Sequence, residues 1–169
     1  MHFSLIDKVT HVEPGVRIRA TKALSIAEEY LRDHFPLFPV MPGVLMLEAM
    51  YEASAWLVRY SEDFRHSAVL LAEARNIKYA DFVQPGKLLE VTAEIIKQDD
   101  RTTSLKASGE VDGQLAVSGR LVLERGQLSE RWNTDEVVDE AVRKRLRRQF
   151  QVLYRPAAAQ AEVTENSTA

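Results

Sequence analysis

The chain contains no cysteine. This absence excludes a disulfide framework, a thiolate metal site and a cysteine nucleophile, and it fits a reducing compartment. A strong charge of either sign is also missing, because 22 basic and 25 acidic residues leave a net charge of −3. Bulk charge therefore does not indicate a nucleic-acid-binding protein. What is present is 46% apolar and 28% charged residues in a chain of 169, which predicts one globular domain of ordinary size.

Long hydrophobic runs are missing as well. The longest apolar-rich stretch, residues 44–58, is interrupted by Glu48 and Glu52 and is shorter than the roughly 20 residues of a membrane-spanning helix. The N-terminus has neither the apolar length nor the flanks of a signal peptide. No nucleotide fingerprint, phosphate-binding glycine loop or Gly-x-Ser-x-Gly elbow occurs. We therefore expect a soluble, cytoplasmic protein with no nucleic-acid or membrane partner.

Proline is scarce but clustered, with three of six prolines at positions 36, 39 and 42. This spacing predicts a loop that forms neither a regular helix nor a sheet ladder. The last of these prolines suits the first position of a helix, and residues 44–59 follow it without a helix breaker. That segment is apolar on nearly every side, which is typical of a helix enclosed by other structure. Before the loop, Ser25 and Glu28 have the spacing of a capping box, which predicts one or two helical turns at residues 26–32.

The remaining periodic segments predict strands. Asp112-Gly113 is a strong two-residue hairpin signal, and Asp99-Asp100 predicts a second turn. Short connections indicate that most neighbouring strands are antiparallel. About five strands and one long buried helix predict an α+β fold in which the sheet wraps around the helix. The predicted strands cover residues 16–21, 68–72, 88–97, 102–111 and 114–124.

A second helix is predicted at residues 133–154. Asn133 is a suitable N-cap, acidic residues stand in the first turn, and basic residues stand near the end, so both charges complement the helix dipole. The basic cluster is interpreted either as a solvated helix end or as a docking patch, and the second reading requires that the helix folds back beside the substrate site. The cluster comprises Arg143, Lys144, Arg145, Arg147 and Arg148.

Candidate acid/base chemistry lies around the proline-rich loop. His34 opens the loop and Glu48 lies one turn inside the buried helix. A carboxylate in such an apolar run must find a partner or have its pKa raised by desolvation. Glu52, four residues later on the same face, raises the pKa of Glu48 further. A glutamate of raised pKa near a histidine is typical of an acid/base pair. Alternatively, Glu48 hydrogen-bonds a backbone group or emerges at the helix edge.

A third candidate is the Gly43 amide. The first amides of a helix have no intrahelical acceptor and lie at the positive end of the dipole, so they suit a developing oxyanion. Alternatively, Gly43 only eases the turn. The other histidines, His2, His11 and His66, show no metal-ligand spacing and are interpreted as ordinary surface or packing residues.

The segment HFPLFPVMPGVLMLEAM at residues 34–50 resembles the signature of the β-hydroxyacyl-acyl-carrier-protein dehydratases of the FabZ/FabA type. That family's pattern, H-F-P-G-x-P-x-x-P-G-V-L-x-x-E-A, places its His and Glu fourteen positions apart, as His34 and Glu48 are here. The flanking segments 9–17 and 76–86 are also similar to the family. The resemblance spans roughly residues 5–124.

The resemblance implies a hot-dog fold that forms homodimers or a trimer of dimers. It implies an active site shared between subunits, with His34 from one and Glu48 from its neighbour. His34 would take a proton from C2 of a (3R)-3-hydroxyacyl thioester, and protonated Glu48 would protonate the departing hydroxyl. The Gly43 amide would hold the thioester oxygen, with Val44 also in the substrate site. The substrate would be linked to acyl carrier protein or CoA, and no cofactor or metal would be needed.

Three functions remain open. The first is the dehydratase, acting in fatty-acid or related acyl-chain synthesis. The second is an acyl-CoA hydratase or thioesterase of the same fold, since one fold hosts several chemistries. The third is a non-catalytic acyl-binding module, which Leu37, Glu52 and the added helix favour. The predicted organisation is a dehydratase-like hot-dog domain at 1–127, a C-terminal helical extension at 128–156 and a disordered tail at 157–169.

Overall fold

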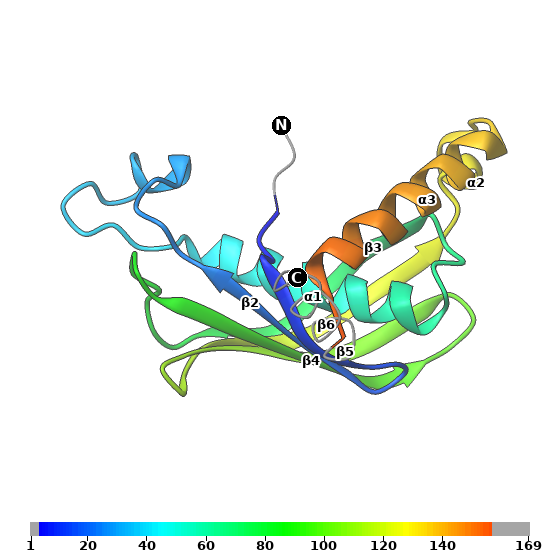
Figure 1. Ribbon diagram of the computed structural model, residues 1–169. Coiled ribbons are helices and arrows are strands. Elements are labelled where there is room, and N and C mark those ends of the chain that lie inside the picture. The colour runs from blue at the N-terminus through cyan, green and yellow to red at the C-terminus, as the bar shows by residue number, and fades with distance from the viewer. Residues whose placement is uncertain (1–3, 157–169) are drawn as a thin grey trace, which may run out of the picture.

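The protein folds as a curved antiparallel sheet wrapped around one long helix (Figure 1). The computed structural model describes residues 4–156. Six strands follow the order β1-β2-β4-β5-β6-β3 across the sheet, and each strand is antiparallel to its neighbours. This is the predicted α+β, hot-dog arrangement. The strands are β1 (Lys8–Glu13), β2 (Arg17–Ala23), β3 (Ala68–Tyr79), β4 (Leu88–Gln98), β5 (Thr102–Val111) and β6 (Gln114–Gly126).

The central helix α1 (Gly43–Ser61) confirms the predicted buried helix and extends two residues past its expected end. Pro42 is its N-cap rather than its first residue. Met46, Met50 and Leu57 are buried against the concave face of the sheet. Burial of such side chains stabilises the fold by about 1.5–3 kcal/mol each, so the apolar content of the helix explains its central position.

The two edge strands are where the predicted sheet differs from the observed one. The residue pattern did not predict strand β1, which only the resemblance at residues 9–17 implied, and β3 runs for 12 residues where five were predicted. The second half of β3 is mostly exposed and carries charged residues on the edge of the sheet. An exposed edge needs no run of apolar residues, so hydrophobic patterning underestimates its length.

The predicted turns between strands are confirmed. Asp112 and Gly113 both have positive φ, as a two-residue hairpin of this kind requires. Asp99 accepts hydrogen bonds from the amides of Arg101 and Thr102 at 2.9 and 2.7 Å, which closes the turn between β4 and β5.

The predicted capping box before the proline-rich loop is wrong. Only a single 3₁₀ turn, η1 (Glu29–Leu31), forms in this segment. Ser25 Oγ accepts from the Ala27 amide at 3.2 Å, but the Glu28 carboxylate turns away and binds Lys22 Nζ at 2.8 Å. An ion pair with a buried lysine thus replaces the reciprocal bond that would have started an α-helix.

The C-terminal segment forms a short helix, α2 (Leu128–Trp132), and then α3 (Glu136–Leu153). The predicted cap Asn133 is wrong by two residues. Asn133 is the left-handed C-cap of α2, and Asp135 caps α3 by accepting from the Val137 amide at 2.9 Å. Helix α3 packs against α1 through Phe150, which is 3% exposed and belongs to the main core.

Two expectations concern residues outside the described part of the chain, namely the role of His2 and the disordered tail at 157–169. Within residues 4–156, none of the helices combines the length and the apolar character that crossing a membrane requires.

Candidate active site

A cavity of about 320 Å³ opens beside the first turn of α1. The proline-rich loop supplies one wall, α1 supplies the floor, and the segment that follows β3 supplies the other wall. The lining side chains are mostly apolar, which suits an acyl chain more than a charged ligand. They include His34, Met41, Gly43, Met46, Tyr79 and Phe82.

His34 is half-buried in this cavity, and its ring is held by the loop itself. Nδ1 lies 3.0 Å from the backbone oxygen of Val40. Because a carbonyl oxygen can only accept, Nδ1 carries the hydrogen of this bond. In the neutral form of this ring, Nε2 is the nitrogen without a hydrogen and can act as a base. The next residue, Phe35, has a φ of 54°, a conformation that costs a bulky residue about 1–2 kcal/mol and that is common at functional sites.

Gly43 lies where a side chain does not fit easily. A Cβ built on Gly43 would stand 3.0 Å from a ring carbon of Tyr79. Gly43 lines the cavity, and its amide, in the first turn of α1, lacks an intrahelical acceptor. Val44 is 67% exposed one position further along the helix. Gly43 lines the cavity and Val44 does not, and the oxyanion and substrate contacts stay predictions.

Glu48 does not line the same cavity as His34 in one chain. Five residues at about 100° each place Glu48 roughly 140° around the helix from Gly43. The carboxylate is half-buried and makes no hydrogen bond with any described residue, so the alternative of a backbone partner is wrong. Desolvation raises its pKa above the ordinary value, as predicted. A single subunit therefore brings together His34 and Gly43 but leaves Glu48 on another face.

The position of Glu52 suggested that it acts on the pKa of Glu48, but in the structure Glu52 binds the N-terminal segment. Its carboxylate accepts from the Leu5 amide at 3.1 Å and from Ser4 Oγ at 3.3 Å. Burial raises the pKa of Glu52, these hydrogen bonds lower it, and the nearby charge of Glu48 raises it. Glu52 thus ties the N-terminal segment to α1. Leu37, the other unusual residue of the motif, is fully exposed and does not fill the cavity.

The raised pKa of Glu48 predicts a pH-dependent stability. The native state binds this proton more tightly than the unfolded chain does. The stabilising contribution is therefore present below pH 4.5, the ordinary pKa of Glu, and is lost as the pH rises through the higher folded value. We expect the parent protein to lose stability relative to Glu48→Gln over this range. Urea unfolding of both proteins at a series of pH values measures this, and a difference that does not change with pH would contradict it.

Lys22 is a buried lysine outside the cavity that was not predicted from the sequence. It is only 6% exposed and bonds Glu28 at 2.8 Å and Asp7 at 3.4 Å. These ion pairs fix the segment that leads into the His34 loop. Lys22 follows the buried residues Ile18 and Ala20 at intervals of two along β2. Because side chains of a strand point alternately to the two faces of the sheet, the sequence could have predicted that this lysine faces inward.

Comparison with known proteins shows extensive similarity. The family model described as the FabA-like domain matches residues 1–120. A 3-hydroxyacyl-[acyl-carrier-protein] dehydratase FabZ from Ruminiclostridium cellulolyticum is 36% identical over 119 residues, covering 70% of this chain and 84% of the relative. The enzyme of the same name from Streptococcus gordonii is 37% identical over 123 residues, covering 73% and 87%.

Solved structures share the fold at lower identity. The dehydratase heterocomplex ApeI:P from Xenorhabdus doucetiae aligns with a TM-score of 0.61 and 20% identity, covering 77% of this chain and 88% of the other. A hypothetical thioesterase with coenzyme A from Streptococcus pneumoniae aligns with a TM-score of 0.55 and 12% identity, covering 70% and 84%. At these identities the likeness concerns the fold alone, which hosts both chemistries.

Proposed function

The chain belongs to the FabA-like family, and from this premise we propose that it removes water from (3R)-3-hydroxyacyl thioesters to give trans-2-enoyl thioesters in fatty-acid or related acyl-chain synthesis. The observation that carries the proposal is the placement of His34, which holds a free Nε2 in an apolar cavity beside the amides that begin α1. A base, an apolar channel and an oxyanion site are what elimination next to a thioester requires.

His34 and Glu48 divide the proton transfers in this proposal. Nε2 of His34 takes the proton from C2, and the electron pair moves into the thioester, whose oxygen gains negative charge. The Gly43 amide stabilises that charge. The electrons then form the C2–C3 double bond as the C3–O bond breaks. Glu48 gives its proton to the leaving oxygen, so that water departs. Burial keeps Glu48 protonated to a higher pH, which supports this role.

The Glu48 that completes each site comes from a second subunit. Support comes from the single chain, in which Glu48 of α1 does not line the cavity that contains His34. Two exposed features are suited to a second copy, the free edge of β3 and the strip of α1 that carries Val44 and Glu48. An isologous pairing through these features places one copy of Glu48 at each cavity. The proposed assembly is a homodimer, or a trimer of such dimers.

We also propose the carrier of the substrate, the compartment in which the protein acts and the division of the chain. The substrate is presented on acyl carrier protein, the carrier that the names of the curated relatives print, or on CoA. The protein acts in the cytoplasm. Residues 1–127 form the family domain and residues 128–156 are an added helical extension, since the family model ends at residue 120.

A product assay tests the proposed function. The protein is incubated with a 3-hydroxyacyl thioester on carrier protein and, separately, on CoA, and the products are followed by mass spectrometry and by the absorbance of the conjugated enoyl thioester. We expect loss of one water with the thioester intact. Release of free thiol would identify a thioesterase instead, and an unchanged substrate would favour the non-catalytic module.

A further inference from the structure

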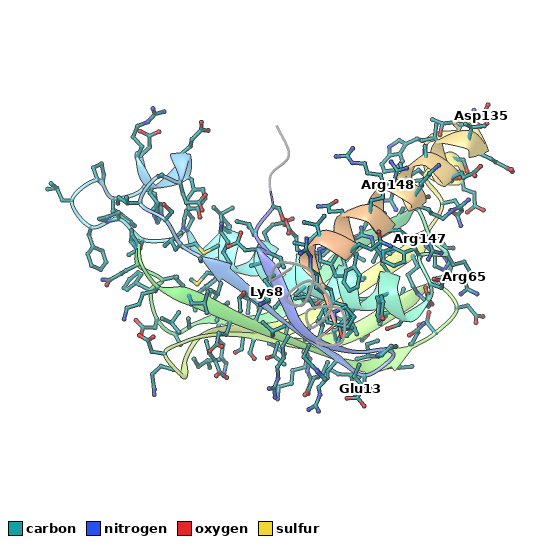
Figure 2. The ribbon with its side chains drawn as sticks, in the orientation of Figure 1. Lys8, Glu13, Arg65, Asp135, Arg147 and Arg148 are labelled. Carbon is teal, nitrogen blue, oxygen red and sulfur yellow. The ribbon has the colours of Figure 1, made fainter. Side chains whose placement is uncertain are left out.

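Helix α3 presents three basic side chains that have no partner among residues 4–156. Arg143 bonds Gln127 at 3.2 Å and Arg147 bonds the Asp63 carboxylate at 2.5 Å, so these two hold α3 on the body of the protein. The remaining three are exposed and unpaired. Figure 2 shows Arg147 and Arg148 on α3 as it crosses above α1. The unpaired side chains, called the α3 basic surface below, are Lys144, Arg145 and Arg148.

The α3 basic surface concentrates like charge on one side of the helix. Lys144 and Arg148 are four residues apart on one face, a spacing at which like charges repel. Glu140 stands four residues before Lys144 and offsets part of this charge, but no acidic residue follows Glu140 in α3. A solvent-exposed helix end usually carries both acidic and basic residues. The mostly basic α3 surface therefore suits an acidic partner better than it suits solvent alone.

The cavity itself lacks positive charge. No lysine or arginine lines it among the described residues, and Asp81 stands at its rim. An acidic carrier that delivers a substrate therefore finds no attraction in the wall of the cavity that one chain builds. Attraction then depends on basic residues outside the cavity wall.

The docking-patch interpretation required α3 to fold back beside the cavity of its own chain. In the structure α3 does not do so. Phe150 of α3 packs against Trp56, Tyr60 and Phe64, at the C-terminal end of α1. The His34 loop lies at the opposite end (Figure 1). Within one subunit, the α3 basic surface and the cavity are on different sides of the molecule.

A second subunit changes this relation. In the proposed homodimer, pairing of the β3 edges across a two-fold axis would make the two α1 helices antiparallel. Suppose that Glu48 of one α1 helix reaches the cavity at the start of the other α1 helix. The C-terminal half of the first helix then extends beyond the start of the second, because a helix rises about 1.5 Å per residue. In the proposed homodimer, helix α3, which packs on this half through Phe150, would then lie near the cavity of the neighbouring subunit.

We propose that the α3 basic surface of one subunit docks the acidic carrier protein whose substrate enters the cavity of the other. This inference rests on the proposed function and names the partner and the surface for it. Docking in trans places positive charge beside a cavity whose own rim is acidic. Such charge raises the rate of encounter with an acidic partner and makes it sensitive to salt.

Charge reversal on intact α3 tests this better than truncation, because removal of the helix would expose the aromatic side chains that Phe150 covers. The test protein carries Lys144→Glu, Arg145→Glu and Arg148→Glu. A matched control carries the same change of net charge on the outer face of the sheet. Its residues, Arg19, Lys106 and Arg120, are exposed and alternate with buried residues of β2, β5 and β6.

Both variants and the parent are assayed with one 3-hydroxyacyl group on carrier protein and on the neutral thiol N-acetylcysteamine, across a salt series. We expect the α3 variant to lose about tenfold or more in kcat/KM for the carrier-linked substrate and to lose its salt dependence. Its rate with the neutral thioester should stay within about twofold of the parent. The control variant should match the parent on both substrates.

Parental carrier-linked kinetics in the α3 variant would overturn the proposal, and so would an equal loss on both substrates or in the control variant. Loss of binding to phosphatidylglycerol vesicles, with unchanged carrier-linked rates, would assign the surface to a membrane instead. Failure of the parent to dehydrate either substrate would count against the proposed function and not against the surface alone.

Discussion

His34→Ala and Glu48→Gln are each expected to lower turnover about a hundredfold or more, the usual scale for a positioned acid or base. His34→Ala removes Nε2, the base that the Val40 carbonyl leaves free. Glu48→Gln keeps the shape of the side chain but removes the proton that the leaving hydroxyl needs. Initial rates of enoyl thioester formation measure both effects.

Two matched variants show whether these losses are specific. His11→Ala changes an exposed histidine on β1, and Glu52→Gln changes a carboxylate on the same helix that binds the N-terminal segment. Both should keep turnover within a few fold of the parent. Circular dichroism should be unchanged for all four proteins. Parental turnover in His34→Ala or Glu48→Gln would remove the role assigned to that residue.

Phe150→Ala is expected to lower the free energy of unfolding by about 3–5 kcal/mol, the usual cost of deleting a buried phenyl ring. The ring lies 4.8 Å from that of Tyr60 and 5.7 Å from that of Trp56, centroid to centroid. Its loss leaves a cavity between α3 and α1. Urea unfolding, followed by tryptophan fluorescence at fixed protein concentration, measures the change.

Val152→Ala is the control for this change, since Val152 is on the same helix but is 72% exposed. Its cost should remain within about 0.5 kcal/mol, as for other surface substitutions. If Phe150→Ala lowered the free energy of unfolding no more than Val152→Ala does, α3 would not be part of the folded core. The proposed position of the α3 basic surface would then be wrong as well.

The central helix and the hairpins could be predicted because local signals determine them. A proline at the start, an unbroken apolar run and an Asp-Gly turn act within a few residues. The His34–Gly43 half of the candidate site followed from the same local features, since the loop and the helix start are adjacent in sequence.

Features that depend on distant partners could not be predicted. The Glu28 carboxylate binds Lys22 instead of capping a helix, and Glu52 binds Leu5 and Ser4 from the N-terminal segment. The length of β3 depends on pairing with β6 rather than on its own pattern. These outcomes depend on which groups the folded chain brings together, and local patterns do not contain that information.

The most direct test of the shared site is an isolated mixed dimer in which one subunit carries His34→Ala and the other Glu48→Gln. Two different affinity tags allow its purification after co-expression. A shared arrangement leaves one site with both residues intact, so we predict about half of the parental turnover per dimer, with unchanged KM. Turnover no higher than the mean of the two inactive homodimers would contradict the account, because each site would then draw both residues from one chain.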